Sequence, residues 1–583
     1  MAPTRLINTK TLDFEEPGDQ IPYAILSHRW LDEEVSFQEW CDRQTRSEIA
    51  ERKGYKKIRS FCREARDDGF DYVWVDTNCI DKANFSELSE AINSMFGWYR
   101  DAAACYVYLH DLDHEPATRV PDLLQRYGSR CEWFSRGWTL QELLAPTAMR
   151  FYARDWVFLG YKEILYETLS ELTGINEKYL KTPDRIFEAS ISERMSWMSQ
   201  RQTTKPEDIA YSLIGIFDIN MPLLYGEGGI KAFRRLQEEI IKVSTDQTIF
   251  AWEWPRGWDA GTKDWVTLFA PTPMAFRNSG GYTPDDRLLD GASSLYSMSN
   301  FGLSISLQII QSCSSQSMKS LNLGASSQLV YAGLHCVVDV GNAPHEELTA
   351  PRTRSLVAIP LLKQSNHFFR AAFPSMPIPI NRLWQAERTL IYAPRLREIG
   401  SDVRHSIDMS IETRDRLEGR YCFFVFTTNE FWEIGDAIST PFWTKFEGLS
   451  CYIGNLGRTR SNSEAIILGI KHAHHPGSQF FLYLGLTKRK GQNRTHCHIE
   501  EAHESEGPTE RNRDRWVKSI TGSPGNQEVT RSAAKVKLES LVTMPNGMKF
   551  IPVYFGVYSF RPPRETPSQA PKSSVAGIIG ADA

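Results

Sequence analysis

The feature that most constrains the fold is an alternation of short apolar runs and amphipathic helical segments over the first 160 residues. Residues 72–75, with the sequence Tyr-Val-Trp-Val, form a near-continuous apolar run. Such a run suits a strand covered on both faces, as in a parallel sheet. Similar runs at 23–27, 105–109 and 149–152 predict three further strands. The alternation therefore predicts a doubly wound α/β domain built on a parallel sheet.

Apolar residues at helical spacing separate these runs. In residues 51–68 they fall on one side of a helix that we expect to end at Gly69. We expect Ser86 to cap the next helix, because its hydroxyl can accept a hydrogen bond from a free backbone N–H. The pattern further predicts that strands 23–27, 72–76 and 105–109 are adjacent and parallel.

The residue pattern changes after residue 160 and again after residue 250. Residues 161–250 carry mostly helical patterns and are expected to extend the α/β core of residues 1–160. Residues 251–562 contain short β-rich runs separated by Gly, Pro, Ser and Asn, which predicts an antiparallel sandwich or barrel-like domain. Within it, polar residues 502–535 are expected to form a mobile loop. Residues 563–583 are expected to be a disordered tail.

The composition limits the class of protein. A chain of 583 residues is too long for one core, and its net charge of −5 gives no general attraction to nucleic acid. No apolar run reaches the roughly 18–20 residues that span a bilayer, and the first residues lack the apolar part of a secretory signal. Ten cysteines without CxxC pairs favour a reducing compartment. We therefore expect a soluble cytoplasmic protein with no membrane span and no nucleic-acid partner.

Residues 133–146, with the sequence WFSRGWTLQELLAP, stand out within the α/β part. They predict a short helix capped by Ser135 and ended by Pro146. Trp138 and Glu142 are four residues apart, so they are expected to share one face of that helix. A carboxylate beside an indole lies in a partly dry site, where its pKa and its reactivity can change.

Polar residues follow the predicted strands at the point where each strand ends. In open α/β sheets ligands gather beyond the carboxyl ends of the strands, so these residues are expected to meet in one crevice with the 133–146 helix. We interpret Glu142 as the candidate catalytic residue. The candidate binding residues are Ser27, His28, Arg29, Trp30, Asp76, Cys79, Asp81 and Trp138.

Each of these residues also has an ordinary structural interpretation, and the sequence leaves both open. The two aspartates can cap helices or close turns, and the thiol can be inert packing. His28 and Arg29 can belong to surface ion pairs, and the two indoles can belong to the core.

Other chemistries have weaker support in the sequence. The chain lacks GxxxxGK[ST], HExxH and GxSxG. The histidines of residues 472–475 and the His-Cys-His run at 496–498 have no second paired ligand motif, so we expect no metal site. A thiol hydrolase built on Cys79 and His28 is a further alternative.

Several long segments of the chain resemble one family. They are YAILSHRW at 23–30, the runs at 54–82 and 86–112, the 133–146 segment, and the run at 194–252. Together they resemble the fungal heterokaryon-incompatibility domain, the HET domain, over most of residues 20–252. The resemblance implies a fungal non-self recognition protein whose HET domain triggers regulated cell death as a signalling or adaptor module. It also implies self-association through this domain and a protein partner of unknown identity.

The HET domain in turn resembles the TIR signalling domain, whose plant-type members carry a Ser-x-Trp-Cys-x-x-Glu-Leu segment. Ser135, Trp138, Glu142 and Leu143 match it, although the serine–tryptophan spacing differs by one residue and Thr139 replaces the cysteine. This resemblance implies an alternative function, NAD⁺ hydrolysis.

In that alternative Glu142 stabilises an oxocarbenium-like transition state, and nicotinamide leaves without a general acid. Arg29 would neutralise the pyrophosphate, and an indole would pack against a ring of the substrate. No cofactor is required, and NAD⁺ is the candidate substrate. The sequence does not separate this enzyme from the adaptor, because both need the same fold.

Overall fold

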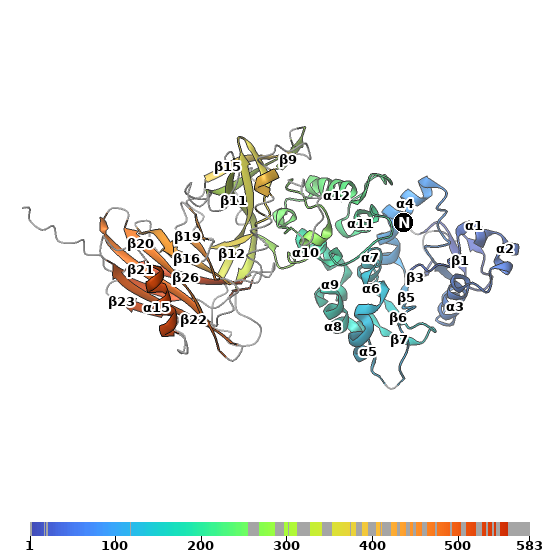
Figure 1. The fold of residues 1–583 in the computed structure, drawn as a ribbon. Coiled ribbons are helices and arrows are strands. Elements are labelled where there is room, and N and C mark those ends of the chain that lie inside the picture. Colours follow the sequence, from blue (N-terminus) through green and yellow to red (C-terminus); the bar gives the residue numbers. More distant parts are fainter. Residues whose placement is uncertain are drawn as a thin grey trace, which may run out of the picture. The chain divides into compact units, whose positions relative to one another are not determined.

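The computed structural model describes residues 3–254, except 17, 19–20 and 117. Beyond them it describes residues 267–285 and the strands and helices bounded below, with short flanking stretches. The chain divides into two compact units. Unit 1 comprises residues 1–419 with 542–548, and unit 2 comprises residues 420–541 with 549–583. Figure 1 labels the elements of both units.

A seven-stranded mixed sheet forms the centre of the N-terminal part of unit 1, in the order β2-β1-β4-β3-β5-β6-β7. Its middle strands β4, β3, β5 and β6 are parallel neighbours, whereas β1, β2 and β7 join the edges antiparallel. The predicted adjacency of three parallel strands is therefore confirmed. Its strands are β1 (Leu6–Asn8), β2 (Phe14–Glu15), β3 (Ala24–His28), β4 (Tyr72–Trp74), β5 (Ala104–Tyr108), β6 (Met149–Tyr152) and β7 (Phe158–Tyr161).

The central strand β3 determines where a ligand can bind. All five of its residues are buried, so both faces of the sheet are covered at this point. The chain passes from β3 to β4 on one side and then returns to β5 on the other side of β3. Crevices in open α/β sheets form beyond the carboxyl ends of strands at such a reversal. The mixed α/β architecture is thus as predicted, and its TIR-like character stays a prediction.

Helices connect these strands much as the apolar spacing predicts. Helix α3 (Lys53–Asp67) is followed by Gly69, whose φ of 91° suits glycine. Helix α4 begins after Asn84, whose side chain accepts hydrogen bonds from the backbone N–H groups of Ser86 and Glu87. The prediction that Ser86 caps this helix is wrong, because Asn84 already occupies the capping position. The other helices here are α1 (Phe37–Cys41), α2 (Arg43–Glu48), α4 (Phe85–Asp101), α5 (Val120–Tyr127), α6 (Glu132–Ser135) and α7 (Thr139–Leu144).

Residues 161–250 are helical, as the sequence predicts. Between residues 206 and 217 the chain forms one short helix, α11, and a separate 3₁₀ turn, η3. The elements are α8 (Lys162–Thr173), α9 (Glu177–Lys181), η2 (Pro183–Glu188), α10 (Ile191–Met198), α11 (Asp208–Tyr211), η3 (Gly215–Phe217), α12 (Gly229–Val243) and η4 (Gln247–Phe250). Among the described residues of the whole chain, no helix is both long and apolar enough to cross a membrane.

The C-terminal part of unit 1 is a second sheet, in which β10, β11, β12, β13 and β15 pair in a closed ring. The prediction of a β-rich, barrel-like region is confirmed for this part. Its strands are β8 (Thr283–Pro284), β9 (Tyr296–Ser299), β10 (Gly302–Gln311), β11 (Gln328–Val340), β12 (Thr353–Gln364), β13 (His367–Arg370), β14 (Met376–Pro379) and β15 (Glu387–Ala393).

The predicted domain boundary near residue 250 does not coincide with the division between the units. Gln247 accepts a hydrogen bond from the backbone of His335 at 2.9 Å. The buried guanidinium of Arg370 donates to the carbonyl of Trp252. Buried hydrogen bonds of this kind tie the end of the helical segment to the closed sheet. The division therefore falls at residue 419.

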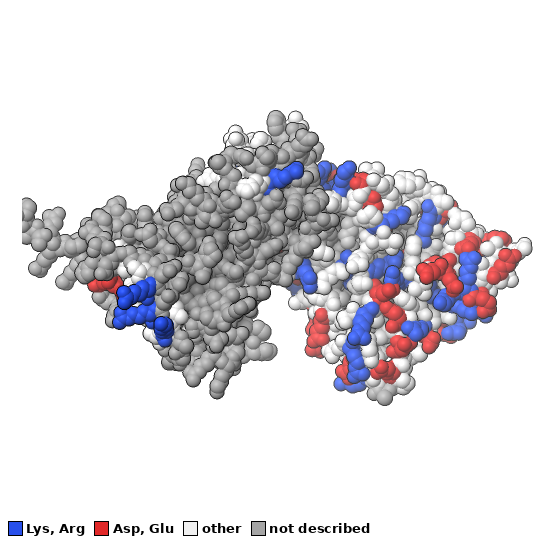
Figure 2. Space-filling view, in the orientation of Figure 1, with Lys and Arg blue, Asp and Glu red and all other residues white. Residues whose placement is uncertain are grey.

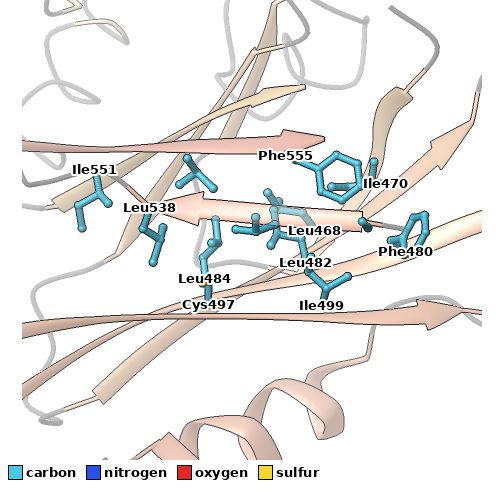
Figure 3. Packing of buried hydrophobic residues seen from close by; sticks show 13 residues of the cluster. Leu468, Ile470, Phe480, Leu482, Leu484, Cys497, Ile499, Leu538, Ile551 and Phe555 are labelled. Atoms are coloured by element: carbon cyan, nitrogen blue, oxygen red, sulfur yellow. The ribbon is translucent and has the colours of Figure 1, made fainter. Parts of the chain in front are cut away.

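Unit 2 is also β-rich and has its own apolar core (Figure 3). Leu482, Leu484 and Ile499 from β21 and β22 pack with Leu538 and Ile551 from β24 and β26. Its elements are β16 (Tyr421–Thr427), β17 (Trp432–Ile438), β18 (Trp443–Phe446), β19 (Cys451–Leu456), β20 (Ser463–His472), β21 (His475–Arg489), β22 (Gln492–Ala502), α15 (Glu510–Ile520), β23 (Glu528–Arg531), β24 (Ala534–Leu538) and β26 (Lys549–Val557).

The loop predicted at 502–535 is in part regular structure. Helix α15 and strand β23 lie in this range, and Trp516 of α15 packs on Tyr483 with ring centroids 5.5 Å apart. The partly buried indole of Trp516 anchors this otherwise polar helix, and a composition so polar predicts a loop. The tail predicted to be disordered at 563–583 lies outside the described residues.

Candidate functional site

A cleft of about 590 Å³ opens at the carboxyl ends of the parallel strands. Apolar side chains of α4, Leu88, Ile92 and Met95, form one part of its wall. Among the sequence-predicted residues, the cleft is lined by Arg29, Trp30, Asp76 and Trp138. The strand ends thus bring together residues from after β3, from after β4 and from the 133–146 segment.

The remaining sequence-predicted residues do not line this cleft. Ser27, His28, Cys79 and Glu142 are buried. The carboxylate of Asp81 accepts hydrogen bonds from the side chain of Gln38 and from the backbone of Ala83. Asp81 therefore closes a turn, as its structural interpretation held.

Glu142 belongs to a buried hydrogen-bonded network under the end of β3. The hydroxyl of Ser27 donates to Glu142 Oε2 at 2.6 Å, and the indole N–H of Trp133 donates to the hydroxyl of Ser27 at 2.9 Å. Burial, reinforced by the charge of Asp76, raises the pKa of Glu142 to about 8. This carboxyl group is therefore mostly protonated at neutral pH, and it joins α7 to the central strand.

The indole connected to this carboxyl group is Trp133 and not Trp138. Trp138 instead donates its N–H to Asp208 at 3.1 Å. The 133–146 segment forms two short helices, α6 and α7, because residues 136–138 interrupt the predicted single helix. Ser135 ends α6 and donates to the carbonyl of Glu132, so the prediction that Ser135 is an N-cap is wrong.

The interruption has a steric cause at Gly137. Its N–H donates to the carbonyl of Gln202 at 2.8 Å, so the two backbone segments approach closely. A Cβ atom added at Gly137 would lie 2.5 Å from Thr203 Cγ2 and 2.6 Å from Met198 Cε. A larger residue would require these two side-chain ends to shift, so glycine suits this contact, which brings the residues around 202 to the cleft wall.

His28 is a buried imidazole at the end of β3. Neither ring nitrogen has a hydrogen-bond partner among the described residues, and Nε2 lies 3.7 Å from Asp76 Oδ1. Burial, together with the charges of Lys57 and Arg136, holds the pKa of His28 well below its ordinary value. The imidazole is therefore neutral, and its surface ion-pair interpretation does not apply.

Trp30 and Asp76 form a hydrogen-bonded pair on the cleft wall. The indole N–H of Trp30 donates to Asp76 Oδ2 at 2.8 Å. The Lys82 ammonium nitrogen lies 3.6 Å from the centroid of the Trp30 ring, and the Arg136 guanidinium carbon lies 5.3 Å from the same centroid. Trp30 is 38% exposed, so it is a surface of the cleft and not core.

Cys79 does not have the properties of a nucleophile. It is buried, it accepts a hydrogen bond from the backbone N–H of Val75, and burial raises the pKa of its thiol to about 12. The reactive species would be the thiolate, so the packing interpretation holds and the hydrolase alternative has no support here.

One group of side chains could hold a metal ion among the described residues. His110, Asp111 and Glu132 each bring one ligand atom within 4.8 Å of the others. Arg29 forms an ion pair with Glu132, and its positive charge opposes a cation at this place. Farther along the chain, His496 forms a hydrogen bond with Thr487 inside β21–β22.

Sequence reasoning missed most of the residues that line the cleft. Lys82 and Arg136 lie beside residues that it singled out, so flanking cations were an available signal. Lys205, Asp208 and Tyr225 come from the helical segment and follow no strand of the sheet. Asp208 accepts hydrogen bonds from Trp138 and, at 3.0 Å, from the hydroxyl of Tyr225.

Comparison with known proteins agrees with this picture of the N-terminal part. Residues 23–129 match the family model described as heterokaryon incompatibility protein (HET). Residues 231–311 match a domain of unknown function (DUF8212). The chain is 48% identical over 230 residues to vegetative incompatibility protein HET-E-1 of Podospora anserina. That similarity covers 39% of this chain and 17% of the length of HET-E-1.

Proposed function

Since the chain carries a heterokaryon-incompatibility (HET) domain, we propose that it acts in vegetative incompatibility, the rejection of genetically different fungal cells. The observation that carries this proposal is the 48% identity over 230 residues to HET-E-1, which is itself a vegetative incompatibility protein. In this proposal the HET domain triggers regulated cell death as a signalling or adaptor module, through self-association and a protein partner.

The burial of Glu142 supports the adaptor over the enzyme. A carboxyl group that is 3% exposed, protonated and hydrogen bonded to the central strand stabilises the fold. The cleft surface is formed by other residues, and these are the ones that a partner or a ligand can reach.

Induced expression of the full chain in a fungal host tests this proposal. We expect wild-type expression to reduce viability while the NAD⁺ content stays constant until the cells die. Trp138→Ala should abolish killing, because this half-buried indole forms part of the cleft surface. Glu142→Gln should retain killing, because glutamine can keep the hydrogen bond from Ser27. Wild-type expression without loss of viability would contradict the proposal.

The second candidate function is NAD⁺ hydrolysis, favoured by the position of the cleft at the strand ends and by its two indoles. In this candidate the ionised form of Glu142 stabilises the transition state. Its pKa of about 8 then requires the rate to rise with pH through that value.

Purified protein incubated with NAD⁺, with and without enforced clustering, tests this second candidate through the release of nicotinamide. Release that rises with pH and disappears in Glu142→Gln would favour the enzyme. Wild-type killing with no release in either condition would decide for the adaptor.

A further inference from the structure

Three cationic side chains on the cleft wall lack a carboxylate partner among the described residues. Lys82, Arg136 and Lys205 line the cleft, and no ion pair within 4.0 Å joins any of them to a described Asp or Glu. Over the α/β part, the face in Figure 2 shows basic and acidic residues interspersed. Lys82 donates a hydrogen bond to the carbonyl of Thr77 at 3.2 Å, which leaves its charge without a counter-ion. A group of cations without carboxylate partners among the described residues of one concavity is therefore a distinct electrostatic feature, since a cleft focuses the field of its charges.

The carboxylates of the cleft are largely engaged by other groups, and among their oxygens in the described residues the buried Asp76 Oδ1 has no hydrogen-bond partner. Both oxygens of Asp208 accept hydrogen bonds, from Trp138 and from Tyr225. Asp76 Oδ2 accepts from Trp30, and Glu132 pairs with Arg29. The described lining carries four cations, Arg29, Lys82, Arg136 and Lys205, against these three carboxylates, so one positive charge is in excess.

Two of these cations lie against the same indole. Lys82 and Arg136 both lie over the ring of Trp30. Partial desolvation in the cleft lowers the pKa of Lys82, and the charge of Arg136 lowers it further. Like charges held together in a partly dry site are unfavourable, and an anion bound between them removes the repulsion.

Part of the remaining wall is apolar or aromatic. Ile92 and Met95 of α4 lie in the same cleft as the rings of Trp138 and Tyr225. Aromatic side chains stack on planar rings, and apolar walls favour their burial. A ligand that complements both the cations and the aromatic side chains of the cleft therefore combines a planar ring with more than one negative charge.

We propose that this cleft binds a small phosphorylated ligand of the nucleotide class. Arg136, Lys82 and Lys205 contact its phosphates, and the apolar wall with Trp138 receives its base. Lys205 and Tyr225 belong to the helical segment, so that segment completes a site begun at the strand ends. This inference concerns binding, and it holds whether or not a ligand is cleaved and whether or not the chain causes cell death.

Calorimetric titration of the full chain tests the proposal with three probes. ADP carries both a ring and phosphates, pyrophosphate has no ring, and adenosine has no phosphate. We expect ADP to bind more tightly than either of the others, with an affinity that falls as salt is added. Lys82→Gln and Lys205→Gln should each weaken ADP binding by roughly tenfold, which is about 1.4 kcal/mol, because each loses a charge-assisted hydrogen bond to a phosphate.

Lys178→Gln is the matched control for Lys205→Gln. Both lysines are exposed, and each lies over a tyrosine ring, at 4.4 Å from the centroid of Tyr179 and at 4.0 Å from that of Tyr225. Lys178 does not line the cleft, so its substitution should leave ADP binding unchanged.

The proposal is overturned by three results. They are the absence of ADP binding at millimolar concentration, equal binding of ADP and adenosine, and equal losses in Lys205→Gln and Lys178→Gln. Melting curves check that the variants fold, as exposed lysines should allow. Because ADP has no nicotinamide bond, failure here is distinct from failure of NAD⁺ hydrolysis.

Discussion

Two groups of residues at the carboxyl end of the same sheet differ in almost every physical property. The inner network of Ser27, Trp133 and Glu142 is buried, and its members bond to one another. The cleft wall of Lys82, Arg136 and Lys205 faces an open volume, and its charges have no carboxylate partners among the described residues. Buried polar groups that are mutually satisfied stabilise a fold, whereas unsatisfied charges at a cleft remain available to a ligand.

This contrast shows that a residue prominent in the sequence motif need not be one that a ligand can reach. Glu142 is the most conspicuous carboxylate of the sequence pattern, but the fold makes it a protonated link between α7 and β3. Arg136 lies only six residues earlier and reaches the cleft. A sequence motif can therefore indicate the residues that support a site structurally more clearly than the residues that contact its ligand.

The largest expected effect is on the inner network. Trp133→Ala should destabilise the α/β part by roughly 3–5 kcal/mol, because it leaves a cavity where a fully buried indole was. Trp30→Ala, at a 38% exposed indole of the cleft wall, should cost much less. Hydrogen exchange of peptides from β3 and β5 measures both. Equal losses in the two variants would remove the distinction between the network and the cleft.

The second effect is a dependence of stability on pH. The pKa of Glu142 is raised from 4.5 to about 8 by folding, so its contribution is fully present below 4.5 and is lost as the pH rises to 8. The slope in this window is up to about 1.4 kcal/mol per pH unit. Glu142→Gln should abolish this loss.

Urea denaturation of wild type and Glu142→Gln between pH 5 and pH 9 measures that slope, at a scale of about 1.4 kcal/mol per unit. The neutral His28 acts in the opposite direction, because its lowered pKa removes stability as the pH falls below its ordinary value of 6.5. Because both proteins contain His28, its contribution cancels in the difference between their free energies of unfolding. Parallel curves for wild type and variant would show that Glu142 is not buried as a neutral acid.

A smaller effect is expected at the backbone contact that joins the two groups. Gly137→Ala should cost about 1–3 kcal/mol, because its Cβ would overlap Thr203 and Met198. The matched control is Gly97→Ala in α4, where the added Cβ would meet only Arg100, at 4.0 Å. Alanine in a helix should stabilise there by roughly 0.5–1 kcal/mol. Thermal melts that shift in the same direction for both would contradict the close approach at Gly137.

The smallest expected effect on stability belongs to the cleft itself. Lys205→Gln should change the free energy of unfolding by less than about 0.5 kcal/mol, as for other exposed positions. Lys82→Gln should remove repulsion by Arg136 together with attraction to Asp76, so its change should also be small. A large loss of unfolding free energy in either variant, measured by urea denaturation, would mean that these cations stabilise the fold and are not available to bind a ligand.

Much of the α/β fold could be predicted from the sequence, because its strands are short apolar runs. The burial of these runs determines the strands whatever the capping residues nearby. Met149–Tyr152 is a strand with the predicted bounds, and β3 and β5 are shifted by one residue. Caps were harder to predict, since Asn84 and Ser86 are both good capping residues and only the backbone geometry selects one.

Among the residues of the site, those that follow a strand of the sheet could be predicted from the sequence. Arg29, Trp30 and Asp76 follow strands, and they do line the cleft. Lys205 and Tyr225 follow no strand, and their approach depends on the backbone contact at Gly137. The burial of Glu142 could not be predicted either, because residues 136–138 divide the helix that was expected to present it.

The most direct test of the central claim is the ionisation of Glu142 itself. Difference infrared spectroscopy between wild type and Glu142→Gln isolates the carboxyl band of this one residue. We predict a protonated-carboxyl band that is present at neutral pH and that disappears with a midpoint near 8. A carboxylate band at neutral pH, with a midpoint near the ordinary value of 4.5, would show that Glu142 is an ionised group facing solvent or ligand. That result would contradict the division between a fold-building network and a ligand-binding cleft.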